Sequence, residues 1–297
     1  MADVLSKGKT LFSEHIINEV FNMVKGKSSI AKLSNREPIP FNGKQVFTFD
    51  FENEIDVVAE NGKKTHGGIK YEPVKMEPLK IEYGARISDA FIYGSEEYKI
   101  KVLKDFNEGF AKKLAKGLDL MVFHGINPRT GTASNVIGDN SLVGKVTGNV
   151  QEAANLNDPI GLLETGAALV LNNDREVSGM AISPELSTAI GKLNHNGVRL
   201  FPEFMFGSTP DNLNGIKIDS NSTVSNKGAT VAFIGDFANR FKWGYAKDVT
   251  TRIIEYGDPD NSGKDLQGYN QIYIRAEAYI GWGIIDPESF AIIKKQG

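Results

Sequence analysis

The residues best placed for chemistry are four carboxylates that alternate along one stretch: Asp50, Glu52, Glu54 and Asp56. On an extended strand this spacing puts all four on one face, and clustered carboxylates can serve acid/base catalysis or cation binding. The segment that follows supplies opposite charges, namely Lys70, Lys75 and Lys80. Because opposite charges across paired strands stabilise a sheet, we interpret the row as a source of cross-strand or intersubunit ion pairs.

A second stretch, residues 257–265, resembles two ligand-binding loops without matching either. Its two glycines are separated by five residues, where a phosphate-binding loop has four, and Asp265 stands where that loop needs Ser or Thr. Its acidic residues alternate with others as in a calcium loop, but Tyr269 occupies the position of the bidentate Glu. We therefore interpret the stretch as a polar surface loop rich in turn-forming residues.

No other pattern points to catalysis. The four histidines are far apart in the sequence: His15, His66, His124 and His195. The chain has no cysteine, which excludes disulfides and thiolate zinc sites and fits a reducing cytoplasm. Nucleophile-elbow, dinucleotide-binding and zinc-protease motifs are also missing. We predict that the protein is not an enzyme and binds no cofactor or metal.

Composition excludes two further classes of protein. The chain has 297 residues, 40% of them hydrophobic, which is enough for one large or two ordinary domains. With 34 basic and 37 acidic residues the net charge is −3, so the protein is not a dedicated nucleic-acid binder. The sequence has no apolar run long enough to span a membrane and no signal-peptide pattern, and we expect neither.

Two elements near the N-terminus are expected to extend from the body. Residues 9–25 have apolar residues at helical spacing, which predicts an amphipathic helix. Residues 25–35 are polar and precede Pro38 and Pro40, which favours an extended arm. Next, residues 46–58 alternate strictly between apolar and polar, which predicts one long strand.

That strand should belong to a projecting hairpin. Asn61-Gly62 suits a turn with positive backbone angles, and Lys63 and Lys64 would lie near the tip. The returning segment, residues 69–83, contains two prolines, which belong on an edge strand. We therefore expect a hairpin that is not buried in its own domain.

A long helix is expected over residues 96–124, ending at Gly125. It would be roughly 40 Å long, and its apolar stripe is Leu103, Phe106, Phe110, Leu114, Leu118 and Met121. Downstream, Asp158-Pro159 and Ser183-Pro184 each predict a helix start. Strands are expected near residues 215–218, 231–234, 249–256, 271–280 and 290–293.

The order of these elements resembles the tailed-phage major capsid proteins of the Hong Kong 97 type. The local matches are Lys44–Asp50, Lys101–Gly125 with Asn127–Gly131, Ile234–Phe237 and Arg275–Phe290. The resemblance implies an α+β Hong Kong 97-like capsid fold with an N-terminal arm (1–35), a peripheral domain (36–51, 79–149 with spine helix 96–124, and 271–297), an extended hairpin loop (52–78) and an axial domain (150–270).

The resemblance also implies a function: a major capsid protein that self-assembles through pentamers and hexamers into an icosahedral shell around the double-stranded DNA genome of a tailed bacteriophage. The implied partners are a portal, a separate scaffold or decoration protein, and packaged DNA without sequence specificity. The implied location is the virion, after assembly in the cytoplasm of the host bacterium. An encapsulin-like nanocompartment shell, or a two-domain enzyme with the hairpin as a dimerisation arm, are the alternatives.

Two sets of residues take contact roles under this resemblance. The expected contacts of the hairpin loop are Phe51, Glu52, Glu54, Ile55, Asp56, Val57, Asn61, Gly62, Lys63, Lys64, Lys70 and Lys75. Those of the arm are Leu11, Phe12, Ile16, Val20 and Phe21. Because the arm-like helix begins at residue 9, we expect no long cleavable scaffolding region before it. The lysines at the hairpin tip are interpreted as solvated rather than as crosslinking residues.

Overall fold

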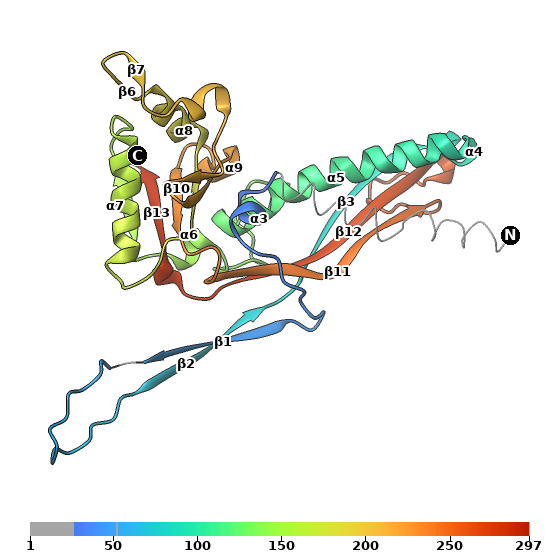
Figure 1. The fold of residues 1–297 in the computed structure, drawn as a ribbon. Coiled ribbons are helices and arrows are strands. Elements are labelled where there is room, and N and C mark those ends of the chain that lie inside the picture. Colours follow the sequence, from blue (N-terminus) through green and yellow to red (C-terminus); the bar gives the residue numbers. More distant parts are fainter. Residues whose placement is uncertain (1–26, 52, 297) are drawn as a thin grey trace.

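The computed structural model describes residues 27–51 and 53–296 and shows an elongated body from which a hairpin projects (Figure 1). Its helices are α3 (Ser29–Leu33), α4 (Ala90–Tyr93), α5 (Glu96–His124), α6 (Leu142–Lys145), α7 (Pro159–Leu171), α8 (Pro184–Lys192) and α9 (Ser222–Ser225), with 3-10 turns η1 (Pro202–Gly207), η2 (Gln267–Tyr269) and η3 (Pro287–Ser289).

Its strands are β1 (Lys44–Phe51), β2 (Ile69–Met76), β3 (Leu79–Ser88), β4 (Val150–Ala153), β5 (Gly179–Ile182), β6 (Asn194–His195), β7 (Val198–Arg199), β8 (Asn212–Leu213), β9 (Ile216–Ser220), β10 (Thr230–Gly235), β11 (Phe241–Ile254), β12 (Gln271–Ile284) and β13 (Phe290–Lys295).

One end of the body is a three-stranded antiparallel sheet in the order β11-β12-β3, with α5 lying along it (Figure 1). The helix begins at the capping residue Ser95, whose side chain accepts a hydrogen bond from the Tyr98 amide, and it ends at Gly125 in the left-handed conformation. This confirms the predicted helix over residues 96–124. Alternate residues of β12, such as Ile274 and Ala278, are fully buried in the cores that the helix helps to form.

The other end is a six-stranded mixed sheet in the order β4-β13-β10-β5-β9-β8. Strand β13 lies inside this sheet, parallel to β4 and antiparallel to β10. Helix α7 packs closely on β10 and β13 because Gly166 has no side chain; a Cβ there would lie 2.7 Å from Ile234 Cδ1. The helices predicted from Asp158-Pro159 and Ser183-Pro184 are confirmed as α7 and α8, while strands β4 and β5 were not predicted.

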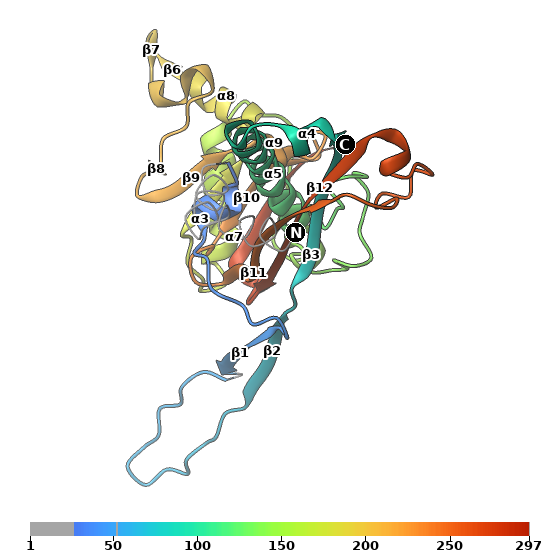
Figure 2. The ribbon, with the colours of Figure 1, turned by 90° about the vertical axis from the view of Figure 1, so that its right-hand side faces the viewer.

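The hairpin is a separate two-stranded sheet of β1 and β2, which extends away from the body in both views (Figures 1 and 2). Pro73 pairs with Phe47 in this register, so the proline does lie on an edge strand. The prediction of one strand over residues 46–58 was wrong, because β1 ends at Phe51. The opposing segment contains Gly67 and Gly68, which are poor strand formers, so the ladder has no partner beyond Ile69.

The chain reverses where the sequence predicts, but with a different turn. The Gly62 amide donates to the Ala59 carbonyl at 2.8 Å. Neither Asn61 nor Gly62 has a positive φ, so the expected turn with positive angles is not formed. A turn with positive angles is favoured when the two strands are paired up to the turn, because its twist matches theirs. Here residues 53–58 are not in a strand, so this preference does not apply.

The expected extended arm is also corrected within residues 27–35. Ser28 caps the short helix α3, whose Ile30 and Leu33 are fully buried. A polar stretch thus forms part of the main core, because its serines cap and hydrogen-bond while its few apolar residues point inward. The helix predicted over residues 9–25, together with Leu11, Phe12, Ile16, Val20 and Phe21, lies outside the described residues.

The sheet pairings cross the boundary expected at residue 270. Strand β11, expected in the axial part, pairs with β12, whereas β13, expected in the peripheral part, pairs with β10. A strand of each sheet is therefore contributed from across the expected boundary. The main hydrophobic core joins α5 to residues of both sheets, including Phe233, Ala276 and Phe290.

Candidate assembly surfaces

The apolar residues expected to make contacts on the hairpin are exposed to solvent. Phe51 is 72% exposed, and Ile55 and Val57 are each 95% exposed. Phe47 and Tyr71 stack across the two strands with ring centroids 4.7 Å apart, but both remain exposed, at 49% and 57%. An isolated subunit thus presents a long apolar surface to water, which is typical of an interaction surface.

The charged residues of the hairpin do not form the single carboxylate row that their spacing suggested. Asp50 lies opposite Lys70 in the β1–β2 register, but Glu54 and Asp56 lie beyond the end of β1. Asp56 accepts a hydrogen bond from Thr65 Oγ1 at 2.7 Å, and Lys75 forms an ion pair with Glu77. Glu52 lies outside the described residues.

The polar residues at the tip are all exposed: Glu54, Asp56, Asn61, Gly62, Lys63, Lys64 and, on β2, Lys75. The tip is therefore solvated on both sides in the isolated chain. Its narrow base is held by Asn53 Oδ1, which accepts a hydrogen bond from the Gly68 amide at 2.9 Å. This hydrogen bond joins the two ends of the loop formed by residues 53–68, although no strand ladder connects its two sides.

The root of the hairpin is held firmly on the body. Residues 37–39 run beside β11, where the amides of Glu37 and Ile39 donate to the carbonyls of Trp243 and Tyr245 at 2.9 and 3.2 Å. This close approach needs Gly244, since a Cβ there would lie 1.6 Å from the Glu37 carbonyl oxygen. Hydrogen bonds from Lys44 and Lys242 lower the pKa of Glu37. The segment that leads into β1 is therefore held in place on the body.

The segment that leads to the N-terminal residues is anchored by a fully buried carboxylate, Asp119 of α5. Five donors point to its two oxygens: Ser28 Oγ at 2.5 Å, the Ser29 amide at 3.0 Å, the Ile30 amide at 3.1 Å, Thr223 Oγ1 at 2.8 Å and Asn221 Nδ2 at 3.3 Å. Burial raises the pKa of Asp119 to about 6, while these donors oppose the shift. One side chain thus ties α3, α5 and α9 together.

The apolar stripe of α5 faces inward. Leu103, Phe110, Leu114, Leu118 and Met121 are buried and Phe106 is half-buried. At the free end of the helix, Tyr93, Tyr98 and Ile100 are exposed. The helix is therefore a core element along most of its length and offers a small apolar surface at its N-terminal end.

A further exposed apolar surface was missed by the sequence reasoning. Residues 194–207, comprising β6, β7 and η1, project from the body at the side away from the hairpin (Figure 1). Phe206 is 99% exposed and has a φ of 56°, which is rare for a bulky residue. The signal was available as a segment rich in apolar residues between Gly197 and Gly207, interrupted by Arg199 and Glu203. This projection is a second candidate for contact with another subunit.

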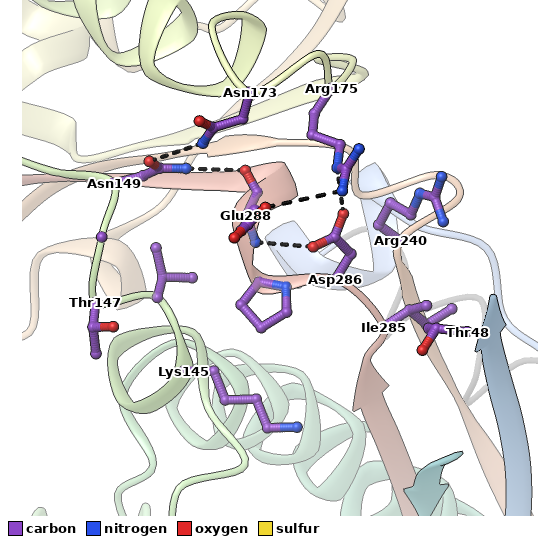
Figure 3. A pocket seen from close by; sticks show the side chains of 13 residues that line it. Thr48, Lys145, Thr147, Asn149, Asn173, Arg175, Arg240, Ile285, Asp286 and Glu288 are labelled. Atoms are coloured by element: carbon purple, nitrogen blue, oxygen red, sulfur yellow. Dashed lines mark hydrogen bonds and ion pairs between the residues drawn. The ribbon is translucent and has the colours of Figure 1, made fainter. Parts of the chain in front are cut away.

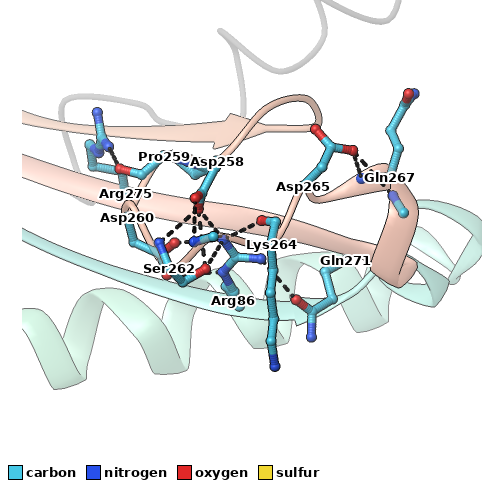
Figure 4. Close-up of polar contacts among 12 residues, drawn as sticks. Arg86, Asp258, Pro259, Asp260, Ser262, Lys264, Asp265, Gln267, Gln271 and Arg275 are labelled. Carbon is cyan, nitrogen blue, oxygen red and sulfur yellow. Dashed lines mark hydrogen bonds and ion pairs between the residues drawn. The ribbon is translucent and has the colours of Figure 1, made fainter.

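The loop over residues 257–265 is a polar surface loop, as predicted, but it encloses a cation from β3. Figure 4 shows the Arg86 guanidinium among the loop's side chains. Its Nη2 donates to Asp258 Oδ1 at 2.6 Å, Asp260 Oδ1 at 2.5 Å and Ser262 Oγ at 2.7 Å. Arg86 lowers the pKa of Asp260. The alternating oxygens thus bind a guanidinium where a calcium loop would bind a metal ion.

The histidines are not brought together. His66 and His195 are exposed, and His124 Nε2 lies 2.9 Å from the Thr223 carbonyl oxygen. His15 lies outside the described residues. Within residues 27–51 and 53–296, no group of three or more metal-ligating side chains is placed to bind a metal ion. In the same part of the chain, no helix has the length and apolarity needed to cross a membrane.

A polar cleft of about 650 Å³ lies where the hairpin root meets the junction of the two sheets. Thr48 lines one side, and Lys145, Arg175 and Arg240 are its cations (Figure 3). Arg175 Nε donates to Asp286 Oδ2 at 2.7 Å. Burial lowers the pKa of Lys145. Sequence reasoning did not single out any of these residues as a site.

A family model described as the phage capsid family matches residues 8–295, nearly the whole chain. The chain belongs to the phage capsid family. Solved structures agree: one from Mycobacterium phage Ogopogo has 29% identity and a TM-score of 0.79, covering 91% of this chain and 92% of that one. One from Gordonia phage Cozz has 24% identity and a TM-score of 0.73, covering 91% and 87%.

A capsid structure of a native GTA particle shares the fold at 12% identity and a TM-score of 0.62, covering 91% of this chain and 90% of that chain. No curated protein sequence matches the chain. Family and fold identify a major capsid protein, a structural protein that assembles with copies of itself and resides in the virion. They do not favour the nanocompartment shell or the two-domain enzyme.

Proposed function

We propose that this capsid protein builds the icosahedral shell, through pentamers and hexamers, that encloses the double-stranded DNA genome of a tailed bacteriophage. The observation that carries this proposal is the hairpin: it has a rigid root and a tip whose Ile55 and Val57 are each 95% exposed. An exposed apolar surface of this kind typically marks a site that another molecule covers. Repetition of one contact around a ring gives closed assemblies of identical subunits.

Each part of the molecule takes one role in this proposal. The three-stranded sheet with α5 is the peripheral part, and the six-stranded sheet, now including β13, is the axial part. The hairpin lies over a neighbouring subunit, and the arm role implied by the resemblance is limited to the residues before Lys27, because α3 is part of the main core. Obligate interfaces of this kind bury roughly 2,000 Å² or more.

The proposed partners follow from the same assembly. A portal occupies one vertex, and a separate scaffold or decoration protein assists where the chain alone does not set the curvature. Contact with packaged DNA is non-specific, in keeping with a net charge of −3. Assembly takes place in the cytoplasm of the host bacterium.

Electron microscopy of the expressed protein tests this function. We expect closed polyhedral shells made of five-fold and six-fold clusters, and particles from the native source should contain a dense DNA core. A folded protein cargo in place of DNA would instead support a nanocompartment shell. A small discrete oligomer under all conditions, with measurable turnover of a substrate, would overturn the capsid function.

A further inference from the structure

The polar cleft at the root of the hairpin has more positive charge than its own residues neutralise. Arg175 contacts both carboxylates of the cleft: its Nε lies 2.7 Å from Asp286 Oδ2 and its Nη2 lies 3.9 Å from Glu288 Oε2. Within the described residues, the side chains of Lys145 and Arg240 have no hydrogen bond or ion pair. Lys145 is partly removed from water, and in the described part of the chain Asp139 is the charge that favours its ammonium form.

A half-buried ammonium group without a partner is unfavourable, because desolvation costs free energy that no ion pair returns. An anionic group placed in this cleft would contact Lys145 on one wall and Arg240 on another (Figure 3). The cleft is open to solvent and has room for several side chains, with a volume of about 650 Å³. It is therefore suited to a segment of polypeptide that carries carboxylates.

The chain itself contains such a segment. The outgoing half of the hairpin, residues 52–60, has four carboxylates and no cation, whereas the two tip lysines follow the turn. Glu54 and Glu60 are exposed, and within the described residues neither side chain has a hydrogen bond or ion pair. The hairpin of the same subunit extends away from the body in both views, so its tip does not occupy its own cleft (Figures 1 and 2).

We propose that the cleft formed by Lys145, Arg175 and Arg240 receives the acidic half of the hairpin, residues 52–60, of a second copy of this chain. This inference rests on the proposed function, in which copies assemble side by side. The contact is heterologous, since a different surface is used on each partner, and such contacts form closed rings when the rotation between copies closes. Complementary charge also selects the register of the hairpin on its neighbour.

A charge-exchange experiment tests the contact. Arg240→Glu should lower the yield of closed shells at least about tenfold, because like charges facing each other at an interface are strongly unfavourable. Adding Glu54→Lys to R240E should restore most of that yield. The matched control is R240E combined with Glu164→Lys, which restores the same net charge from an exposed position on α7 and should not rescue assembly. Equal rescue by both, or normal assembly of R240E, would overturn the proposal.

A second experiment uses the unaltered protein, so that it does not depend on the folding of variants. Zero-length carbodiimide treatment of wild-type shells, mixed from normal and ¹⁵N-labelled subunits, should form an amide between Lys145 Nζ and a carboxylate of residues 52–60, with loss of water. The linked peptides should combine normal and labelled chains, and free subunits should lack the link. Links from Lys145 only to the N-terminal residues would overturn the proposal and indicate that those residues occupy the cleft. A defect of R240E assembly that is seen only when DNA is present would also overturn it and indicate that the cleft binds phosphate.

The shell function and the contact between cleft and hairpin can be tested separately. If the wild-type protein forms no shells, the proposed function is wrong. If it forms shells in which Lys145 and Arg240 contact no hairpin carboxylate, the proposed function stands and only this contact is wrong.

Discussion

At the residue scale, Asp119 shows how one buried carboxylate fixes the path of the chain. It is an acceptor for donors from two segments that are distant in sequence, residues 28–30 and 221–223. An ionised carboxylate accepts all of these hydrogen bonds, whereas an amide has two N–H groups that would face other donors. Asp119 therefore acts as an obligatory acceptor rather than as a catalytic group.

We predict that Asp119→Asn lowers the free energy of unfolding by about 2–3 kcal/mol at neutral pH, because buried donors lose their acceptor. The measurement is urea denaturation of unassembled subunits. Asp174→Asn is the matched control, since Asp174 is exposed and has a φ of 56° that Asn also adopts readily. A loss of equal size in both variants would contradict the anchoring role.

The pH dependence of this loss has a defined sign. The folded-state pKa of Asp119, about 6, lies above the ordinary value of 3.8. Protonation therefore favours the folded state, and the stability contributed by this group increases as pH falls from about 6 to about 4. The difference in unfolding free energy between the wild type and D119N should grow over the same range. Carboxylates with lowered pKa values, such as Glu37 and Glu277, have the opposite effect, but they are common to both proteins and cancel in the difference.

A second prediction at this scale concerns Arg86. Arg86→Lys keeps the positive charge but loses the planar set of donors that reaches Asp258, Asp260 and Ser262 together. Amide hydrogen exchange across residues 258–265 should become faster, while exchange in α5 stays unchanged. Arg129→Lys, at an exposed loop position, is the control and should alter neither. Unchanged exchange in R86K would show that the loop holds its form without the guanidinium.

At the scale of elements, the hairpin combines a stable root with an uncovered tip. Ile55 and Val57 contribute little to the stability of the isolated subunit because they remain in water. We predict that Ile55→Ser with Val57→Ser leaves the urea midpoint unchanged but prevents closed shells, as seen by electron microscopy. Val136→Ser, at another exposed apolar residue (78% exposed), is the control. Normal shells from the double variant would show that Ile55 and Val57 are not needed for contacts between subunits.

Some elements could be predicted from sequence because their signals are local. The helix over residues 96–124 has a capping serine, a periodic apolar stripe and a terminal glycine in the left-handed conformation. The hairpin root was predictable from alternation and its prolines. The end of β1 at Phe51 was not, since it depends on what the partner segment can pair with. The placement of β13 beside β10 is a pairing between residues far apart in sequence, and no local pattern specifies it.

For the candidate contact surfaces too, features with a local sequence signal were predictable and those that depend on distant residues were not. The exposed tip of the hairpin was expected from its apolar residues, which have no partner nearby. The binding of Arg86 by residues 258–262 was missed, because the sequence separates the guanidinium from its acceptors by more than 170 positions. The cleft around Lys145 and Arg240 was missed for a similar reason: α6, β11 and the turn before β13 meet only in the folded chain.

At the scale of the whole molecule, assembly should change which bonds a protease can reach. Lys63 and Lys64 lie in an exposed segment without regular structure, which is a preferred site of cleavage. Trypsin should cut free subunits there first and should cut assembled shells far more slowly, as followed by mass spectrometry. Lys192, exposed at the end of α8, serves as an internal comparison. Equal cleavage at Lys63 in both states would mean that neighbours do not cover the hairpin.

The position of β13 between β4 and β10 also bears on the synthesis of the protein. Within the described residues, β4 pairs only with β13, so residues 150–153 have no ladder partner until residues 290–295 have left the ribosome. One edge of β10 is likewise open until then, and open edges invite pairing between nascent chains. The six-stranded sheet is therefore completed only after translation has passed residue 295.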